Sequence, residues 1–216
     1  MREQIIQKVL DKKIVAIVRG VYGEDCVNLA RALCEGGIEL LEVTFDQSKP
    51  ESLNRTSDTI RQLVQALGDK MIFGAGTVTT LEMLELARNA GAQFVVSPDT
   101  NEEVIKATVA AGMVSMPGAL TPTEIVTAHR YGADFVKLFP AGTQGTAYFK
   151  AMTAPLNHIR LLAVGGVNEK NIADFMAAGA VGAGVGGNLV NKTWIANGEF
   201  DKITALAKEF TEKAGV

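Results

Sequence analysis

A lysine stands in the middle of an apolar segment, DFVKLFPAG, at residues 134–142. Lys137 lies between Val136 and Leu138 with a phenylalanine beyond each of them, a pattern typical of a buried strand. Burying an unpaired ammonium in such surroundings is unfavourable by roughly several kcal/mol. A desolvated lysine can lose its proton near neutral pH and attack a carbonyl carbon to form a Schiff base. The segment therefore indicates a nucleophilic amine.

A carboxylate occupies a similar position in the apolar run IELLEVTF at residues 38–45. Because side chains alternate along a strand, each run presents one set of residues on one face: Ile38, Leu40, Glu42 and Thr44 in the first, and Phe135, Lys137 and Phe139 in the second. If both faces point into one interior, Glu42 and Lys137 meet among apolar walls. Two interpretations stay open: a buried ion pair that fills the core, and an acid–base group beside a nucleophile. Burial favours the neutral forms of Lys137 and Glu42, whereas their mutual attraction favours the charged forms. The sequence does not decide which effect is larger.

Two Gly-Gly pairs add a second chemical signal, in AVGGV at residues 163–167 and in GVGGNL at 184–189. Each pair lies where an apolar strand is expected to end. Glycine lets backbone N–H groups approach a phosphate without an intervening side chain. A single pair would indicate only a tight turn, but two pairs on the last two strands favour a phosphate site.

Eight short apolar runs alternate with amphipathic helical stretches along the whole chain, and the helical stretches often finish in a small-residue turn. The runs cover residues 14–19, 38–45, 71–77, 94–98, 114–119, 134–141, 160–167 and 180–190. This order predicts a single α/β domain over residues 1–216, a (β/α)8 TIM barrel preceded by one helix at residues 2–10. A doubly wound open sheet is the alternative, but it normally uses five or six strands.

In such a barrel the active site lies at the carboxyl ends of the strands. The polar residues of the runs fall at these ends. Arg19 ends the first run, Glu42 and Thr44 lie late in the second, Thr77 ends the third, Ser97 and Pro98 end the fourth, and Lys137 lies late in the sixth. We therefore expect these side chains to meet at one mouth of the barrel.

Composition favours a small-molecule partner. The net charge of −3 is spread along the 216 residues without a basic run, so neither nucleic acid nor an anionic membrane is expected. The first residues lack the apolar stretch of a signal peptide, and no run reaches the length of a membrane span, so a cytoplasmic location is expected. The two histidines, His129 and His158, are expected away from the mouth, and no cluster has metal-ligand spacing. We therefore expect neither a metal nor another cofactor.

Taken in order, LEVTF, GAGTV, VSP, PGALTPTE, FVKLFPA and AVGGV resemble the 2-keto-3-deoxy-6-phosphogluconate (KDPG) and 4-hydroxy-2-oxoglutarate (KHG) aldolases over residues 5–205. The resemblance implies a metal-independent barrel enzyme that forms homotrimers. It implies that Lys137 forms the imine and that Glu42 is the general acid and base, acting through a water. It also implies a substrate-binding set: Thr77 for the pyruvate carboxylate, Pro98 and Phe139 for the pocket walls, and Gly165, Gly166, Gly186 and Gly187 for the phosphate.

The chain departs from the gluconate-type pattern at three places. Asp46 stands where an arginine is typical, and Arg19 on the first strand could supply that charge instead. AVGGV stands in place of a threonine-containing version of the first Gly-Gly segment, and Asn188 replaces a serine after the second pair. Arg19 and AVGGV resemble the galactonate-type branch. These changes leave the aldolase chemistry and put the substrate in doubt.

Three functions therefore remain under consideration. The first is cleavage of a 2-keto-3-deoxy-6-phospho sugar acid, of gluconate or galactonate type, to pyruvate and glyceraldehyde 3-phosphate. The second, which Asp46 motivates, is cleavage of unphosphorylated 4-hydroxy-2-oxoglutarate to pyruvate and glyoxylate. The third is a non-catalytic barrel that binds a phosphorylated metabolite, with Lys137 serving only as a charge partner.

Overall fold

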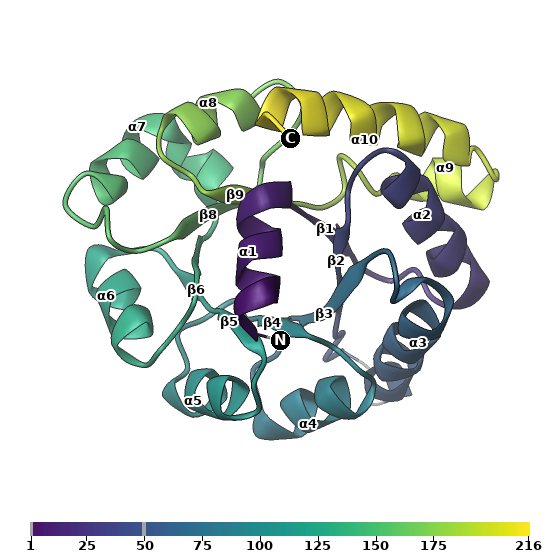
Figure 1. Cartoon of the computed structure of the whole chain (residues 1–216), viewed down its shortest axis with the longest axis horizontal. Helices are drawn as coiled ribbons and strands as arrows, with labels where there is room; N and C mark the ends of the chain where they lie inside the picture. Colours follow the sequence, from purple (N-terminus) through teal and green to yellow (C-terminus); the bar gives the residue numbers. More distant parts are fainter. Residues whose placement is uncertain (1, 49–50) are drawn as a thin grey trace.

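The computed structural model describes residues 2–48 and 51–216, and in these residues nine short parallel strands are ringed by helices (Figure 1). Each strand pairs with its neighbours in the order β5-β4-β3-β2-β1-β9-β8-β7-β6. The strands are β1 (Ile14–Val18), β2 (Leu40–Thr44), β3 (Ile72–Gly76), β4 (Phe94–Val96), β5 (Val114–Met116), β6 (Gly118–Ala119), β7 (Val136–Leu138), β8 (Leu161–Val164) and β9 (Gly182–Val185). The predicted (β/α)8 barrel is confirmed.

The predicted fifth strand, residues 114–119, is divided in two at Pro117. Proline has no N–H to give to a strand ladder, so the pairing is interrupted there. β5 pairs with β4 on one side, and β6 pairs with β7 on the other. The carbonyl oxygen of Pro117 accepts a hydrogen bond of 2.8 Å from the backbone N–H of Lys137. One continuous segment of chain therefore joins the two ends of the sheet and brings the barrel to closure.

Except for α1, the helices follow the strands and cover the outside of the barrel (Figure 1). They are α1 (Arg2–Lys12), α2 (Gly23–Glu35), α3 (Glu51–Leu67), α4 (Leu81–Asn89), α5 (Glu102–Ala110), α6 (Pro122–Arg130), α7 (Ala141–Thr153), α8 (Ile172–Ala177), α9 (Lys192–Ala196) and α10 (Phe200–Ala214). Local sequence sets several starts. Thr121 and Glu124 form a capping box around Pro122 at the start of α6. Among the described helices, none is long and apolar enough to cross a membrane.

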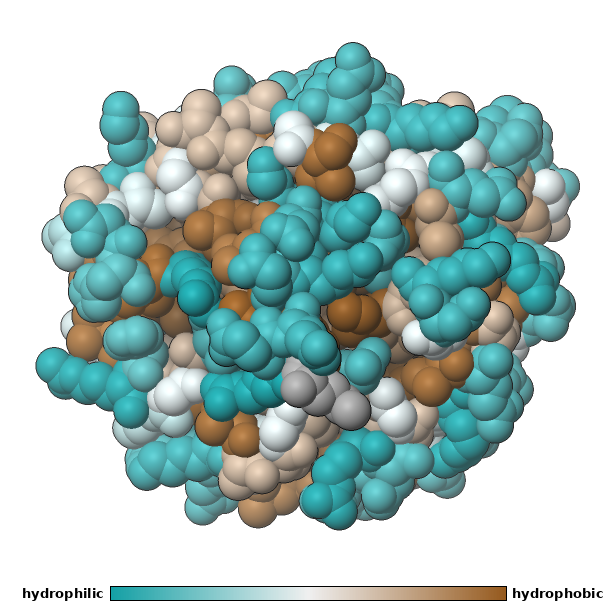
Figure 2. Space-filling view, in the orientation of Figure 1, coloured by the Kyte–Doolittle hydropathy of each residue, from teal (hydrophilic) through white to brown (hydrophobic). Residues whose placement is uncertain are grey.

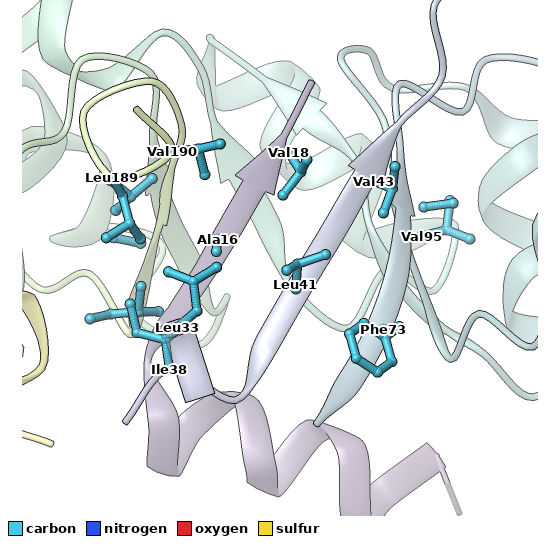
Figure 3. Close-up of a cluster of buried hydrophobic side chains, with 14 of the residues drawn as sticks. Ala16, Val18, Leu33, Ile38, Leu41, Val43, Phe73, Val95, Leu189 and Val190 are labelled. Atoms are coloured by element: carbon cyan, nitrogen blue, oxygen red, sulfur yellow. The ribbon is translucent and has the colours of Figure 1, made fainter. Parts of the chain in front are cut away.

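Alternation along the strands separates two apolar clusters. The outer cluster lies between strands and helices, where Leu41 and Val43 of β2 point (Figure 3). The inner cluster fills the barrel and includes Leu40 from the opposite face of β2. The prediction that Ile38 shares the face of Leu40 was wrong. Ile38 precedes β2, follows the turn at Gly36 and Gly37, and packs in the outer cluster.

Helix α1 covers the amino-terminal end of the barrel (Figure 1). Its apolar residues Ile5, Ile6 and Val9 belong to the inner cluster. Its cations pair with residues that precede strands: Arg2 Nη2 lies 2.8 Å from Asp134 Oδ1, and Lys12 Nζ lies 2.6 Å from Glu39 Oε1. In the space-filling view of this face, hydrophilic side chains cover the centre (Figure 2). The opposite end, where the strands finish, is left for the site.

Candidate active site

A cavity of about 300 Å³ opens at the carboxyl ends of the strands. Eleven predicted site residues line it: Arg19, Glu42, Thr77, Pro98, Lys137, Phe139, Gly165, Gly166, Gly186, Gly187 and Asn188. Thr44 and Ser97 were also expected at this mouth, but they are buried and do not line the cavity. The sequence reasoning missed four lining residues, Ile17, Val164, Val167 and Gly184. Alternation could have found two of them, because Ile17 lies two residues before Arg19 and Gly184 two before Gly186.

Lys137 and Glu42 face this cavity from β7 and β2. Both side chains are buried, with relative exposures of 8% and 3%. The structure as described has no hydrogen bond or ion pair between them, and none from either side chain to another residue. The interpretation of a core-filling ion pair is therefore wrong. The amine and the carboxylate are two unpaired groups that share one cavity.

Burial decides the protonation of both groups. Burial lowers the pKa of the Lys137 ammonium, and the positive charge of Arg19 lowers it further. The negative charges of Glu42 and Asp99 act in the opposite direction and raise this pKa. Burial raises the pKa of Glu42 to about 7, although Lys137 and Arg19 oppose the shift. The effect of desolvation on both pKa values is therefore larger than the effect of mutual attraction. The sequence alone did not decide which of these two effects is larger. Near pH 7 both forms of the Glu42 carboxyl group are populated, and the balance at Lys137 is shifted toward the uncharged amine.

The floor under the two groups is apolar. A small second cavity, of about 10 Å³, lies between them and the barrel interior. Apart from Glu42 and Lys137, its walls are Val15, Ile17, Val96, Met116, Leu162, Val164 and Gly184. On the open side, the Phe139 ring centroid lies 4.9 Å from Lys137 Nζ. These walls keep water from the ammonium on most sides, which is the cause of its lowered pKa.

Two glycines of β3 make room on its inner face, and they explain the GAGT segment. A Cβ placed on Gly74 would stand 2.3 Å from the ring of Phe94, which fills that space. A Cβ placed on Gly76 would stand 2.5 Å from Glu42 Oε1 and 2.9 Å from the methyl carbon of Thr44. Only glycine at position 76 lets the Glu42 carboxylate lie against this strand.

Arg19 and Thr77 meet at the rim. Arg19 Nη2 donates a hydrogen bond of 3.3 Å to Thr77 Oγ1. Thr77 has a φ of 60°, in the left-handed region that β-branched residues rarely adopt. Such strained backbone conformations occur most often at functional sites. The guanidinium and the hydroxyl group can each donate a hydrogen bond, and the two oxygen atoms of a carboxylate can accept both. Together they form a candidate site for a carboxylate ligand.

Two glycine loops line another part of the cavity. Gly165 and Gly166 have φ values of 86° and 78°, and a Cβ at Gly165 would stand 2.9 Å from the Phe139 ring. A Cβ at Gly187 would meet no atom within 4 Å. Asn188 Nδ2 donates to the carbonyl oxygen of Val167 at 3.2 Å and so ties the loops after β8 and β9 together. The arrangement presents backbone without side chains to the cavity, as a phosphate site requires.

Asp46 does not line the cavity. Its Oδ1 accepts a hydrogen bond of 2.9 Å from the backbone N–H of Ser48, two residues on, in the manner of an Asx turn. The carboxylate is used by the turn after β2. The repulsion of an anionic substrate that Asp46 suggested in the sequence is weakened by this placement.

No group of metal-ligating side chains occurs within residues 2–48 and 51–216. His129 lies in the last turn of α6, and its ring centroid lies 5.5 Å from that of His158. Because α6 returns toward the start of β7, both rings are at the amino-terminal end of the barrel, as predicted.

The fold and the cavity define a (β/α)8 barrel that carries an unpaired lysine and an unpaired glutamate at the carboxyl ends of its strands. The chain belongs to the KDPG and KHG aldolase family, whose model matches residues 5–206. It is 37% identical to 2-dehydro-3-deoxy-phosphogluconate aldolase of Treponema pallidum, over 94% of each chain. It is 33% identical to 2-dehydro-3-deoxy-6-phosphogalactonate aldolase of Escherichia coli, over 92% of this chain and 95% of that protein.

A solved structure of KDPG aldolase from Legionella pneumophila has the same fold. It holds pyruvate captured at low pH as a covalent carbinolamine intermediate. Its TM-score with this chain is 0.83, with 26% identity over 94% of this chain and 96% of that one.

Proposed function

We propose that this chain is a class I aldolase that cleaves a 2-keto-3-deoxy-6-phospho sugar acid to pyruvate and glyceraldehyde 3-phosphate. One observation carries the proposal: Lys137 and Glu42 are both buried, both without a hydrogen bond or ion pair in the described chain, and both on one cavity with an apolar floor. The similarity to gluconate-type and galactonate-type aldolases supports the same conclusion.

In the proposed reaction the uncharged Lys137 Nζ attacks the C2 carbonyl carbon of the substrate. The hydroxyl group of the carbinolamine takes up a proton and leaves as water, which gives a protonated imine. Glu42, as carboxylate, accepts the proton of the C4 hydroxyl through a water while the C3–C4 bond breaks and its electron pair moves into the imine. The products of this step are an aldehyde and an enamine. Glu42 then returns the proton to C3, and water hydrolyses the imine to release pyruvate.

The pKa of Glu42, raised to about 7 by burial, suits this double role. A general acid and base works best when its pKa lies near the working pH, because both protonation states are then populated. Arg19 and Thr77 are proposed to hold the substrate carboxylate, and Pro98 and Phe139 to form the walls beside it. Gly165, Gly166, Gly186, Gly187 and Asn188 are proposed to hold the phosphate with backbone and amide N–H groups. The covalent imine takes the place of a cofactor, so treatment with EDTA should leave the rate unchanged.

Reduction with borohydride in the presence of pyruvate tests the proposal. The expected result is one pyruvate-derived mass increment, on the peptide that contains Lys137. The Lys137→Arg variant is the matched control and should stay unmodified, since its guanidinium does not lose a proton. An unmodified wild-type protein would contradict the proposal. It would favour the non-catalytic barrel, in which Lys137→Arg keeps phosphometabolite binding and no 2-keto acid is turned over.

A substrate panel identifies the sugar acid. KDPG, its galactonate epimer and 4-hydroxy-2-oxoglutarate are compared by kcat/KM. The two glycine loops favour the phosphorylated compounds by orders of magnitude, because phosphate contacts lower the barrier only when a phosphate is present. Equal values for 4-hydroxy-2-oxoglutarate would support the unphosphorylated alternative.

A homotrimeric assembly and a cytoplasmic location remain predictions that rest on the family resemblance and on the sequence. Sedimentation equilibrium of the purified chain measures the first. A mass of three chains is expected.

A further inference from the structure

The first two residues after β8 each have their carbonyl oxygen bound by a donor from another segment. The backbone N–H of Gly142, at the start of α7, donates a hydrogen bond of 2.7 Å to the carbonyl oxygen of Gly165. Asn171 Nδ2, just before α8, donates one of 3.0 Å to the carbonyl oxygen of Gly166. Gly165 and Gly166 line the cavity, whereas Gly142 and Asn171 do not. The two carbonyl groups are therefore bound to atoms outside the cavity lining.

The N–H groups of the same two peptides point the other way. In a planar trans peptide, the C=O of one residue and the N–H of the next lie on opposite sides. The N–H of Gly166 therefore points away from Gly142, and the N–H of Val167 points away from the amide of Asn171. Within residues 2–48 and 51–216 neither N–H donates a hydrogen bond, and both residues line the cavity. The loop carries two neighbouring free donors, an arrangement that binds anions.

A Gly-Gly pair needs support to keep this orientation. Glycine adopts positive and negative φ about equally well, so a peptide between glycines can turn over at little cost. The φ values of Gly165 and Gly166 are 86° and 78°. A peptide turned over would present its carbonyl oxygen to the cavity, and the partial negative charge of that oxygen would repel a phosphate. The hydrogen bonds from Gly142 and Asn171 exist in one orientation only, so they favour the one in which the N–H groups are free.

Close contact with Gly142 also fixes the loop. A Cβ on Gly142 would stand 2.8 Å from both the Cα and the carbonyl oxygen of Gly166, and 2.9 Å from the carbonyl oxygen of Gly165. These are backbone atoms, which cannot rotate away as the end of a side chain could. Gly142 has no positive φ, so the contact rather than the conformation requires glycine here. The start of α7 is packed directly on the loop after β8.

We propose that Gly142 and Asn171 are positioning residues for the substrate phosphate. They hold the loop after β8 with its free N–H groups toward the cavity, and so they set the preference for phosphorylated substrates. The hydrogen bond from Asn188 Nδ2 to the carbonyl oxygen of Val167 continues the pattern one residue further. A loop that is already oriented spends no binding free energy on turning when the phosphate arrives. This inference rests on the proposed aldolase function.

The first test compares Asn171→Ala with Asn168→Ala. Asn168 is in the same turn, but its side chain accepts a hydrogen bond of 2.9 Å from the N–H of Lys170 and does not contact the loop carbonyls. Two quantities are measured: KM for the phosphorylated sugar acid, and the pyruvate concentration that gives half-maximal borohydride trapping at Lys137, a reaction without phosphate.

We expect Asn171→Ala to raise KM for the phosphorylated substrate about tenfold at unchanged kcat, the effect of one lost hydrogen bond that supports binding. The pyruvate concentration for half-maximal trapping should not change. Asn168→Ala should leave both quantities at their wild-type values.

The second test compares Gly142→Ala with Gly68→Ala. A Cβ on Gly68 would stand 2.5 Å from the carbonyl oxygen of Val64, so this glycine also lies against backbone, but it does not line the cavity. Both variants should have a lowered melting temperature. Only Gly142→Ala should also raise KM for the phosphorylated substrate, by about tenfold or more, with the half-maximal trapping of pyruvate unchanged.

The outcomes are distinct. A wild-type KM in Asn171→Ala overturns the role of the loop supports and leaves the aldolase proposal in place. A parallel rise in the pyruvate concentration for trapping also overturns it, because the substitution would then disturb the whole mouth of the barrel. A wild-type protein that traps pyruvate but does not prefer phosphorylated substrates overturns this inference while the imine chemistry stands. A wild-type protein that does not trap pyruvate overturns the proposed function and, with it, this inference.

Discussion

The carboxylate of Glu42 occupies the space that a side chain at Gly76 would need. A Cβ on Gly76 would stand 2.5 Å from Glu42 Oε1, a separation that real Cβ atoms do not show. Because Gly76 is the residue of β3 that pairs with Thr44, the room for the acid–base group is made by the neighbouring strand. The position of Glu42 is thus set by two strands that lie next to each other in the barrel.

Gly76→Ala is expected to displace Glu42 and lower kcat/KM by a factor of about 100, since small misplacement of a catalytic group has effects of that size. Borohydride trapping at Lys137 should change much less. The matched control is Gly74→Ala on the same face of β3, where the new methyl meets Phe94 rather than Glu42. Gly74→Ala should lower the melting temperature and keep kcat/KM per folded molecule. Equal losses of kcat/KM in the two variants would refute this account of Gly76.

Glu42 should make the protein less stable as the pH rises. Burial raises its pKa to about 7 from the ordinary 4.5, so the folded state holds this proton more tightly than the unfolded chain does. The resulting stabilisation is fully present below pH 4.5 and is lost as the pH rises through 7, by about 3 kcal/mol. Urea unfolding of the wild type and of Glu42→Gln, from pH 4 to pH 8, measures the effect. The stability of the wild type relative to the variant should fall across this range, whereas a constant difference would mean that the carboxyl group is not desolvated.

Lys137→Met should raise stability while it abolishes activity. The unpaired amine is desolvated on an apolar floor, and methionine fills similar space without a charge. A gain of about 1–2 kcal/mol is expected, as is common when an active-site residue is removed. Lys137→Arg is the control and should lower stability, because its charge cannot be lost. A less stable Lys137→Met would show that the amine contributes to the fold.

Gly187→Ala tests the proposed phosphate loop without disturbing the backbone. The new methyl meets no atom within 4 Å, so the melting temperature should stay the same. It would occupy space where the phosphate is proposed to approach the backbone. KM for the phosphorylated substrate should rise about tenfold, and KM for 4-hydroxy-2-oxoglutarate should not change. If both values rise together, the loop after β9 contacts a part common to both substrates.

Much of this architecture could be read from the sequence. The order of apolar runs predicted the barrel. The residues at the strand ends predicted part of the cavity lining, such as Arg19, Glu42 and Lys137, and the family resemblance added Phe139 and Asn188. What failed was local. Residues 114–119 look like one strand, yet Pro117 divides them because each half pairs with a different neighbour. Ile38 precedes β2 and follows the turn at Gly36 and Gly37, so the alternation of side chains within the strand does not extend to it.

The protonation of Lys137 and Glu42 could not be predicted from the sequence. It depends on how closely the two groups approach and on which walls surround them, and neither is encoded in spacing along the chain. Asp46 is a similar case. Its residue type suggested repulsion of the substrate, but the direction of its side chain follows from the hydrogen bond with the Ser48 N–H. Thr44 was recognised as a neighbour of Glu42, whereas its missing hydrogen bond appears only in three dimensions.

Helix α1 closes one end of the barrel with Ile5, Ile6 and Val9, so substrate enters and products leave the cavity through the opposite end. In the proposed reaction, the aldehyde and the hydrolytic water then share a single passage. Pyruvate stays bonded to Lys137 as the imine until hydrolysis, whereas the aldehyde has no covalent bond to the protein after cleavage. Product release is therefore ordered, with the aldehyde first and pyruvate last, and pyruvate should be the product that competes with substrate for the free amine.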